Sequence, residues 1–109
     1  MPRTNSDQLH GTLDMLVLKT VEDGPLHGYA IALRLERLSG DVLAVEEGSL
    51  YPALYRMESR GWLKSQWSTT ETGRRARFYK LTSAGRSQLA AERESWARLT
   101  AAVQSVLGS

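Results

Sequence analysis

The hydrophobic pattern of this chain changes its period, and that change limits the folds available to it. In the first half, apolar residues recur every three or four positions, which is typical of amphipathic helices. From Trp62 the period falls to two, which predicts strands over 62–68 and 76–81 joined by a polar loop. The helical period then returns and continues to about Leu107. The sequence therefore predicts several helices, one β-hairpin and a long final helix.

Three helices are expected before the hairpin. The first covers 7–22 and the second 27–38, and each ends at a glycine-containing turn. The third begins at Ser49, a typical N-cap residue, with Pro52 in its first turn, where a missing N–H costs little. The short apolar segment 42–45 is either a connector or an edge strand.

This order of elements predicts a mainly α fold with a small β-hairpin. Three helices followed by a basic hairpin describe a winged helix-turn-helix, in which the hairpin is the wing. We expect a flexible N-terminal arm over 1–6, a DNA-binding winged helix-turn-helix domain over 7–82 and a C-terminal dimerisation helix over 83–109.

Positive charge is concentrated in the second half of this domain. The segment 48–80 holds seven basic and two acidic residues, a net charge of +5, which leaves −3 on the rest of a chain whose net charge is +2. A basic face of this kind suits a polyanion, although a solvated charged surface has the same composition.

The sequence has no motifs typical of secreted, membrane-spanning, metal-binding or enzymatic proteins. The chain has no cysteine, no long apolar run and no basic-then-apolar start, so we expect a cytoplasmic protein with no disulfide, membrane span or cofactor. Its two histidines lack metal-site spacing, and His27 is expected to cap or pack near a helix start. Nucleotide-binding and hydrolase motifs are absent, so we expect neither a metal site nor an enzyme.

The outward face of the third helix and the wing are the predicted contacts with DNA. Arginine and serine can bond base edges, tyrosine hydroxyls can bond phosphates, and guanidinium groups on a loop can follow the backbone. Tyrosines that only pack and arginines that are only solvated remain the alternatives. The predicted contacts are Ser49, Tyr51, Pro52, Tyr55, Arg56, Arg74, Arg75 and Arg77.

The final helix carries an apolar seam with a period of seven. Because a lone projecting helix cannot bury such a stripe on its own domain, the same helix of a second subunit is the expected partner. Folding back within one subunit is the alternative. The predicted seam residues are Leu89, Trp96, Leu99, Val103 and Val106.

A small-molecule effector site is a further hypothesis. An interface between helices can leave an apolar gap, which Trp96 would border with Met15 or Leu18 of the first helix. Plain packing of these three side chains is the alternative.

Three stretches of the sequence resemble the PadR family of bacterial transcriptional regulators. They are "GTLDMLVLKTVEDGPLHGYAIALRL" from Gly11, "GSLYPALYRMESRGWL" from Gly48 and "GRRARFYKLTSAG" from Gly73, in the family's order. The short C-terminal part is similar to the family's compact branch, and within it to the acidobacterial-type group.

The resemblance implies a homodimer that binds an inverted-repeat operator in double-stranded DNA, usually as a repressor released by a small ligand. By position, Tyr51 resembles the family's phosphate-contacting tyrosine, and Arg74 and Arg75 resemble its wing arginines. Gly73 departs from the pattern, because close relatives often have a larger polar residue there. The competing function is a winged-helix module that binds an acidic protein partner.

Overall fold

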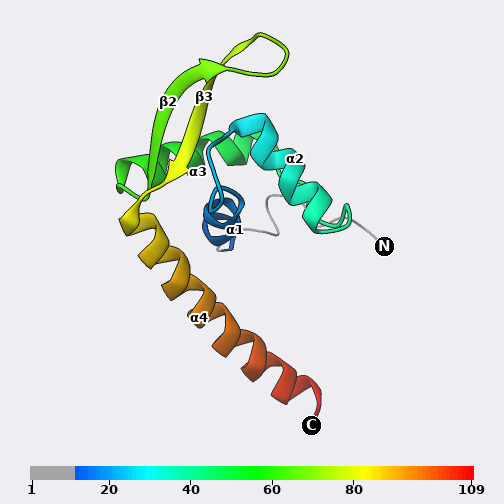
Figure 1. Cartoon of the computed structure of the whole chain (residues 1–109). Helices are drawn as coiled ribbons and strands as arrows, with labels where there is room; N and C mark the ends of the chain where they lie inside the picture. The colour runs from blue at the N-terminus through cyan, green and yellow to red at the C-terminus, as the bar shows by residue number, and fades with distance from the viewer. Residues whose placement is uncertain (1–11) are drawn as a thin grey trace.

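A computed structural model describes residues 12–109 and contains four helices and three strands. In chain order these are α1 (Leu13–Thr20), β1 (Leu26–His27), α2 (Gly28–Leu38), α3 (Glu47–Ser59), β2 (Leu63–Thr69), β3 (Arg75–Leu81) and α4 (Ser83–Leu107). Figure 1 shows α1, α2 and α3 grouped together, the β2–β3 hairpin projecting beyond α3, and α4 running away from this group to the C-terminus. The predicted winged helix-turn-helix with a long final helix is confirmed. The predicted N-terminal arm and the expected start of the first helix lie outside the described residues.

The sheet has three antiparallel strands in the order β1-β3-β2. Strands β2 and β3 pair along their whole length, from Leu63 opposite Leu81 to Thr69 opposite Arg75. Strand β1 pairs only Leu26 and His27 with the other side of β3. The sequence did not predict this strand, because two residues are too few to show a period of two.

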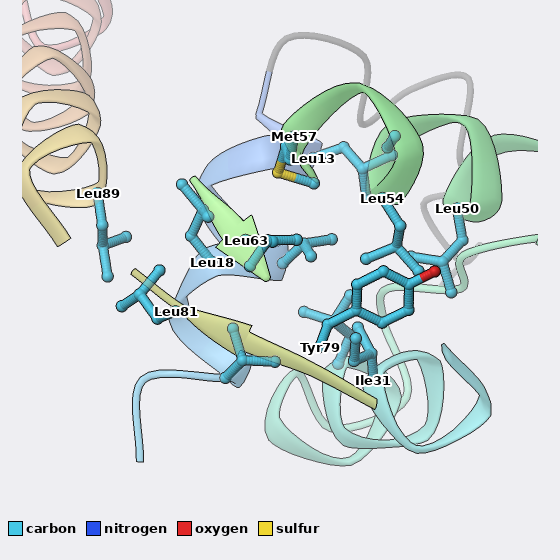
Figure 2. Close-up of a cluster of buried hydrophobic side chains, with 14 residues drawn as sticks. Leu13, Leu18, Ile31, Leu50, Leu54, Met57, Leu63, Tyr79, Leu81 and Leu89 are labelled. Carbon is cyan, nitrogen blue, oxygen red and sulfur yellow. The ribbon is translucent and has the colours of Figure 1, made fainter. Parts of the chain in front are cut away.

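The core lies where α1, α2, α3, the sheet and the start of α4 meet (Figure 2). Burying each large apolar side chain contributes roughly 1.5–3 kcal/mol. Burial also raises the pKa of the Tyr79 hydroxyl above its ordinary value. The core residues are Leu13, Val17, Leu18, Val21, Ile31, Leu35, Leu50, Ala53, Leu54, Met57, Leu63, Tyr79, Leu81 and Leu89.

The N-cap of helix α3 lies three residues earlier than the sequence predicted. Its N-cap is Glu46, which makes no side-chain capping bond, and Glu47 places a negative charge in the first turn, where the helix dipole favours it. Ser49 is therefore inside the helix, and its predicted capping role is wrong. Pro52 lies beyond the first turn and has no N–H to donate to the carbonyl of Gly48.

The N-cap residues of α2 and α4 both accept a hydrogen bond with their side chains, and the predicted capping role of His27 is confirmed. The Nδ1 atom of His27 accepts a hydrogen bond from the amide of Ala30 at 3.4 Å, at the start of α2. The Thr82 hydroxyl accepts one from the amide of Gly85 at 3.0 Å, at the start of α4. The segment 42–45 is a connector, with one isolated bridge residue at Leu43.

The start of α4 packs so closely on the preceding turn that only glycine fits there. A Cβ atom on Gly85 would lie 2.1 Å from the carbonyl oxygen of Trp62 and 2.7 Å from Cδ1 of Leu81. That carbonyl already accepts a hydrogen bond from the amide of Thr82 at 3.1 Å, so it is not free to move.

We expect Gly85→Ala to lower the free energy of unfolding by about 3 kcal/mol, because the new methyl group overlaps backbone atoms. Urea denaturation followed by circular dichroism measures the loss. Gly24→Ala is the control, since a Cβ there meets nothing within 4 Å. Equal stability of the two variants would contradict this account of the α4 junction.

The two halves of α4 differ in their surroundings. Leu89 is 3% exposed and belongs to the core, against Leu81 (Figure 2). Near it, the Arg86 guanidinium donates to the carbonyl oxygen of Glu22 at 3.4 Å. The Lys19 ammonium donates to the Glu22 carboxylate, and this bond holds the pKa of that carboxyl below its usual range.

The second half of α4 carries exposed apolar side chains in a row. Trp96 and Val103 are each 46% exposed, and Leu99 and Val106 are more exposed. Leu89 is therefore not part of the predicted dimerisation seam, because its own domain buries it. The rest of the seam, from Trp96 onward, remains available to a partner.

Candidate nucleic-acid interface

Helix α3 has one buried and one solvent-facing side. Leu50, Ala53, Leu54 and Met57 form the buried side, as the helical period predicts. On the opposite side Tyr55 is 73% exposed, and Pro52 and Arg56 are also exposed. Ser49 is half-buried. The solvent-facing side is thus short, polar and aromatic.

Tyr51 lies at the edge of this exposed side and packs against α2. A Cβ atom on Gly28 would lie 2.7 Å from Cε1 of Tyr51 and 2.9 Å from its hydroxyl oxygen. The tyrosine ring therefore occupies the space that glycine leaves at the start of α2. This contact fixes the ring while part of it stays exposed, so Tyr51 combines the packing role and the exposure that the sequence analysis treated as alternatives.

Arg56 is exposed, but its guanidinium is already paired. It donates to the carboxylate of Asp14 on α1, and the two side chains form an ion pair. The sequence prediction placed Arg56 as a contact free to reach a base. To do so it has to leave Asp14 or share its donors, since a guanidinium carries five N–H groups.

A polar network joins the wing to α3. The hydroxyl of Ser65 donates to Oε2 of Glu58 at 2.5 Å, and Nε of Arg77 donates to the Ser65 hydroxyl at 2.8 Å. A second nitrogen of Arg77 lies 3.6 Å from the same Glu58 oxygen. Arg77 therefore links the hairpin to α3. Its side chain stays exposed, and its role as a DNA contact stays a prediction.

The tip of the wing is a tight, hydrogen-bonded turn. The amide of Thr70 donates to the carbonyl of Arg74 at 2.7 Å, and the amide of Gly73 donates to the carbonyl of Thr70 at 2.9 Å. Gly73 has a φ of 84°, a conformation that larger residues rarely adopt. Gly73 therefore suits this turn, and Arg74 beside it is exposed to solvent.

Trp67 is an exposed wing residue outside the set of predicted DNA contacts. It lies directly opposite Arg77 in the β2–β3 register, and the guanidinium of Arg75 stacks over its ring at 5.8 Å from the centroid. The indole is nevertheless 56% exposed. The strand alternation could have revealed this, because it places Trp67, Arg75 and Arg77 on one face of the hairpin.

Comparison with known proteins identifies the family of this chain. Residues 17–91 match the sequence profile described as the Transcriptional regulator PadR-like family, over more than half of the chain. The chain belongs to the PadR-like family. The matched region runs from α1 into α4 and includes α3 and the whole wing. Assignment to the acidobacterial-type group stays a prediction.

Two sequence relatives of this PadR-like chain match it over very different shares of their own lengths. An uncharacterised 37.1 kDa protein in a transposon of Streptomyces fradiae is 45% identical over 101 residues, which are 93% of this chain and 26% of that protein. The chain thus spans about a quarter of that relative. A transcriptional regulator of Mycobacterium tuberculosis is 35% identical over 79 residues, covering 72% of this chain and 70% of that protein.

Solved structures show the same PadR-like fold. A transcriptional regulator of Clostridium thermocellum superposes with a TM-score of 0.83 at 26% identity, covering 92% of this chain and 97% of that one. A PadR family transcription regulator of Clostridium difficile superposes with a TM-score of 0.77 at 30% identity. The match covers 89% of this chain and 99% of that one.

The three predicted effector residues of this PadR-like chain differ in how exposed they are. Leu18 is fully buried in the core, so it cannot line a gap between subunits, and that prediction is wrong. Met15 packs partly buried against the core, and Trp96 is exposed on α4.

Residues 12–109 contain no group of acidic and histidine side chains able to hold a metal, and no helix in that range could span a membrane.

Proposed function

We propose that this protein is a sequence-specific, DNA-binding transcriptional regulator that represses from an inverted-repeat operator as a homodimer. The observation that carries the proposal is the Glu58–Ser65–Arg77 network, which fixes the wing relative to α3. A helix and a basic loop in a constant relative position can engage two neighbouring parts of one duplex at once. The family membership supports the same role.

In this proposal α3 and the wing have different tasks. Tyr51 and Tyr55 offer hydroxyls to phosphates beside the major groove, and Arg56 reads a base edge. At the wing, Arg74 and Arg75 contact the sugar–phosphate backbone or enter the minor groove. Ser49 and Pro52 lie on the same helix and set how closely it approaches the groove.

The dimer is proposed to form through the exposed row Trp96, Leu99, Val103 and Val106 of α4. An uncovered apolar stripe on a helix costs free energy that a matching stripe on a second subunit recovers. An apolar gap beside Trp96, with Met15 at its rim, remains the proposed effector site. Quenching of tryptophan fluorescence by flat aromatic compounds tests it, and an unchanged signal across a varied panel would reject it.

The DNA upstream of this protein's own gene is the first target to test, because such regulators often act on their own promoters. DNase footprinting on that DNA should show two half-sites related by inverted repeat, about 34 Å apart from centre to centre. A single asymmetric half-site would contradict the dimeric arrangement, and protection of no sequence at all would contradict the proposed function.

The role of Arg56 can be separated from its ion pair with Asp14. We expect Arg56→Gln to weaken operator binding by about 1–3 kcal/mol, because a base contact is lost. Asp14→Asn removes the same ion pair but leaves the arginine free, so it should keep or strengthen operator binding. Fluorescence anisotropy with labelled operator measures both. If the two variants bind equally weakly, the ion pair and not base recognition explains Arg56.

Trp67 is expected to orient Arg75 for its DNA contact. Trp67→Ala removes the stacking surface and should weaken DNA binding by about 1 kcal/mol, whereas Trp67→Phe retains a ring and should recover most of the loss. Circular dichroism establishes that both variants fold. Equal losses in the two variants would show that the ring does not act through the arginine.

A further inference from the structure

Strand β2 forms an open edge of the sheet. In the strand order β1-β3-β2, β3 occupies one side of β2, and no strand within residues 12–109 pairs with its other side. The edge is seven residues long, and it belongs to a hairpin that projects beyond α3 (Figure 1). After Leu63, all of its residues are at least partly exposed. An exposed strand edge of this length is a template to which another extended chain can add by hydrogen bonding.

The hydrogen bonds of the hairpin show which backbone groups of β2 face the open edge. In an antiparallel pair of strands, hydrogen-bonded and non-hydrogen-bonded residue pairs alternate. At the base of the hairpin, the amide of Thr82 donates to the carbonyl of Trp62 at 3.1 Å. At the tip, the amide of Thr70 donates to the carbonyl of Arg74 at 2.7 Å. The even-numbered residues of β2 therefore bond to β3, and the odd-numbered residues turn their N–H and C=O groups to the open edge.

The outward-facing groups are regularly spaced at Ser65, Trp67 and Thr69. Within residues 12–109, no backbone group outside the sheet bonds to them. They lie two residues apart, which is the spacing at which an added antiparallel strand exchanges hydrogen bonds. The side chains of these three residues share one face of the hairpin, and Lys64 and Gln66 lie on the other. An added strand therefore meets different side chains on its two faces.

The face with Lys64 favours an acidic partner. Lys64 lies directly opposite Lys80 of β3, and like charges in that position destabilise a sheet. Neither lysine forms an ion pair with another residue in the range 12–109. The hairpin segment 62–82 holds five basic residues and one acidic residue, a net charge of +4. A second copy of the hairpin is therefore repelled from this edge, whereas an acidic chain is attracted to it.

The opposite face offers an apolar surface. The indole of Trp67 is 56% exposed, and the guanidinium of Arg75 stacks over its ring. A side chain beside Trp67 on a neighbouring strand can bury part of this ring, and aromatic pairs of this kind stabilise a sheet. The two faces together select a strand in which acidic and apolar residues alternate.

From these observations we propose that the open edge of β2 binds an extended acidic segment of a partner protein, which adds to the sheet as a fourth, antiparallel strand. Backbone hydrogen bonds to Ser65, Trp67 and Thr69 hold the segment. A carboxylate lies beside Lys64, in a non-hydrogen-bonded pair, where opposed side chains approach each other most closely. An apolar side chain lies beside Trp67. This contact is additional to the proposed DNA contacts and does not rest on them.

Titration of the full-length, ¹⁵N-labelled protein with a capped decapeptide of alternating valine and glutamate, followed by amide NMR, tests the edge without any DNA. We expect saturable shifts that are largest at the amides of Ser65, Trp67 and Thr69, because these N–H groups face the peptide. Lys64→Gln should weaken binding about tenfold, the loss expected for one charge-assisted hydrogen bond. Lys19→Gln is the matched control, because Lys19 lies on α1 and not on the hairpin; its binding should stay within roughly twofold of the wild type.

Methylation of the peptide amides tests the backbone hydrogen bonds. In the antiparallel arrangement the valines share the face of Trp67 and their amides bond to β2, whereas the glutamate amides point away. A peptide N-methylated at every valine should show no saturable binding. A peptide N-methylated at every glutamate should bind within about threefold of the unmodified one.

A pair of protein variants tests the same hydrogen bonds from the side of β2. Trp67→Pro removes an outward N–H that β3 does not use, and edge strands tolerate proline at such positions. Trp67→Ala removes the ring but keeps the N–H. We expect Trp67→Pro to bind the peptide at least about fivefold more weakly than Trp67→Ala.

Several outcomes would overturn the proposal. The first is that the valine-methylated peptide, or an alternating valine–lysine peptide, binds as well as the unmodified acidic peptide. The second is that the shifts centre on α4, or that Trp67→Pro and Trp67→Ala bind equally. The third is that the β2 amides shift with protein concentration in the absence of peptide, which would place a second copy of this chain at the edge. None of these outcomes depends on whether the protein binds DNA.

Discussion

Replacing Leu99 and Val103 by aspartate is expected to convert the protein into monomers that bind its operator at least about a hundredfold more weakly. Both side chains are exposed on the single chain, so the winged domain should fold as before. A carboxylate buried in an apolar helix seam without a partner, however, costs several kilocalories per mole. A monomer would bind one half-site at a time, so it would lose the affinity that a dimer gains by binding two half-sites simultaneously.

A matched control adds the same negative charge to the same helix but leaves the seam residues unchanged. Ala101→Asp with Gln104→Asp adds two carboxylates to the same stretch of α4, at exposed positions off the seven-residue repeat. Sedimentation velocity at micromolar concentration should show monomers for the seam variant and dimers for the control. If both variants are dimers, the dimer interface lies elsewhere. If both variants are monomers, the added negative charge, and not the loss of the seam, disrupts the dimer.

The second large effect is expected at the tip of the wing. Arg74→Ala with Arg75→Ala should weaken binding to operator and to random duplex by the same factor, roughly a hundredfold at moderate salt, because phosphate contacts carry no sequence information. Each lost contact should lower the slope of log affinity against log salt by about one, or about four for the dimer.

Fluorescence anisotropy over a salt series measures this slope. Arg93→Ala with Arg98→Ala removes two arginines from α4, away from the wing, and serves as the control. An unchanged slope in the wing variant would refute the phosphate contacts, as would an equal change in the control.

Much of the fold follows from local patterns in the sequence. The change of period at Trp62 located the wing, and the return of the helical period after the second strand located α4. The buried side of α3 followed from the spacing of its apolar residues. These features depend on residues close together in the chain, and the sequence displays them directly.

Apart from the start of α3, the errors concern contacts between distant segments. The seven-residue spacing assigned Leu89 to the dimer seam, but the first turns of α4 pack on the core, which buries that residue. The sequence likewise gives no sign that Arg56 meets Asp14, 42 positions away, or that Arg77 reaches Glu58. Strand β1 is held only by its pairing with β3, and it has no local pattern of its own.

The binding of the wild-type protein to random duplex DNA across a salt series tests the central claim most directly. With four wing arginines per dimer on the backbone, log affinity should fall linearly with log salt, with a slope of about −4 or steeper. The alternative function, a module for an acidic protein partner, predicts no duplex binding at low salt. Absence of binding, or binding whose affinity does not change with salt, would contradict the assignment of α3 and the wing as a DNA-binding surface.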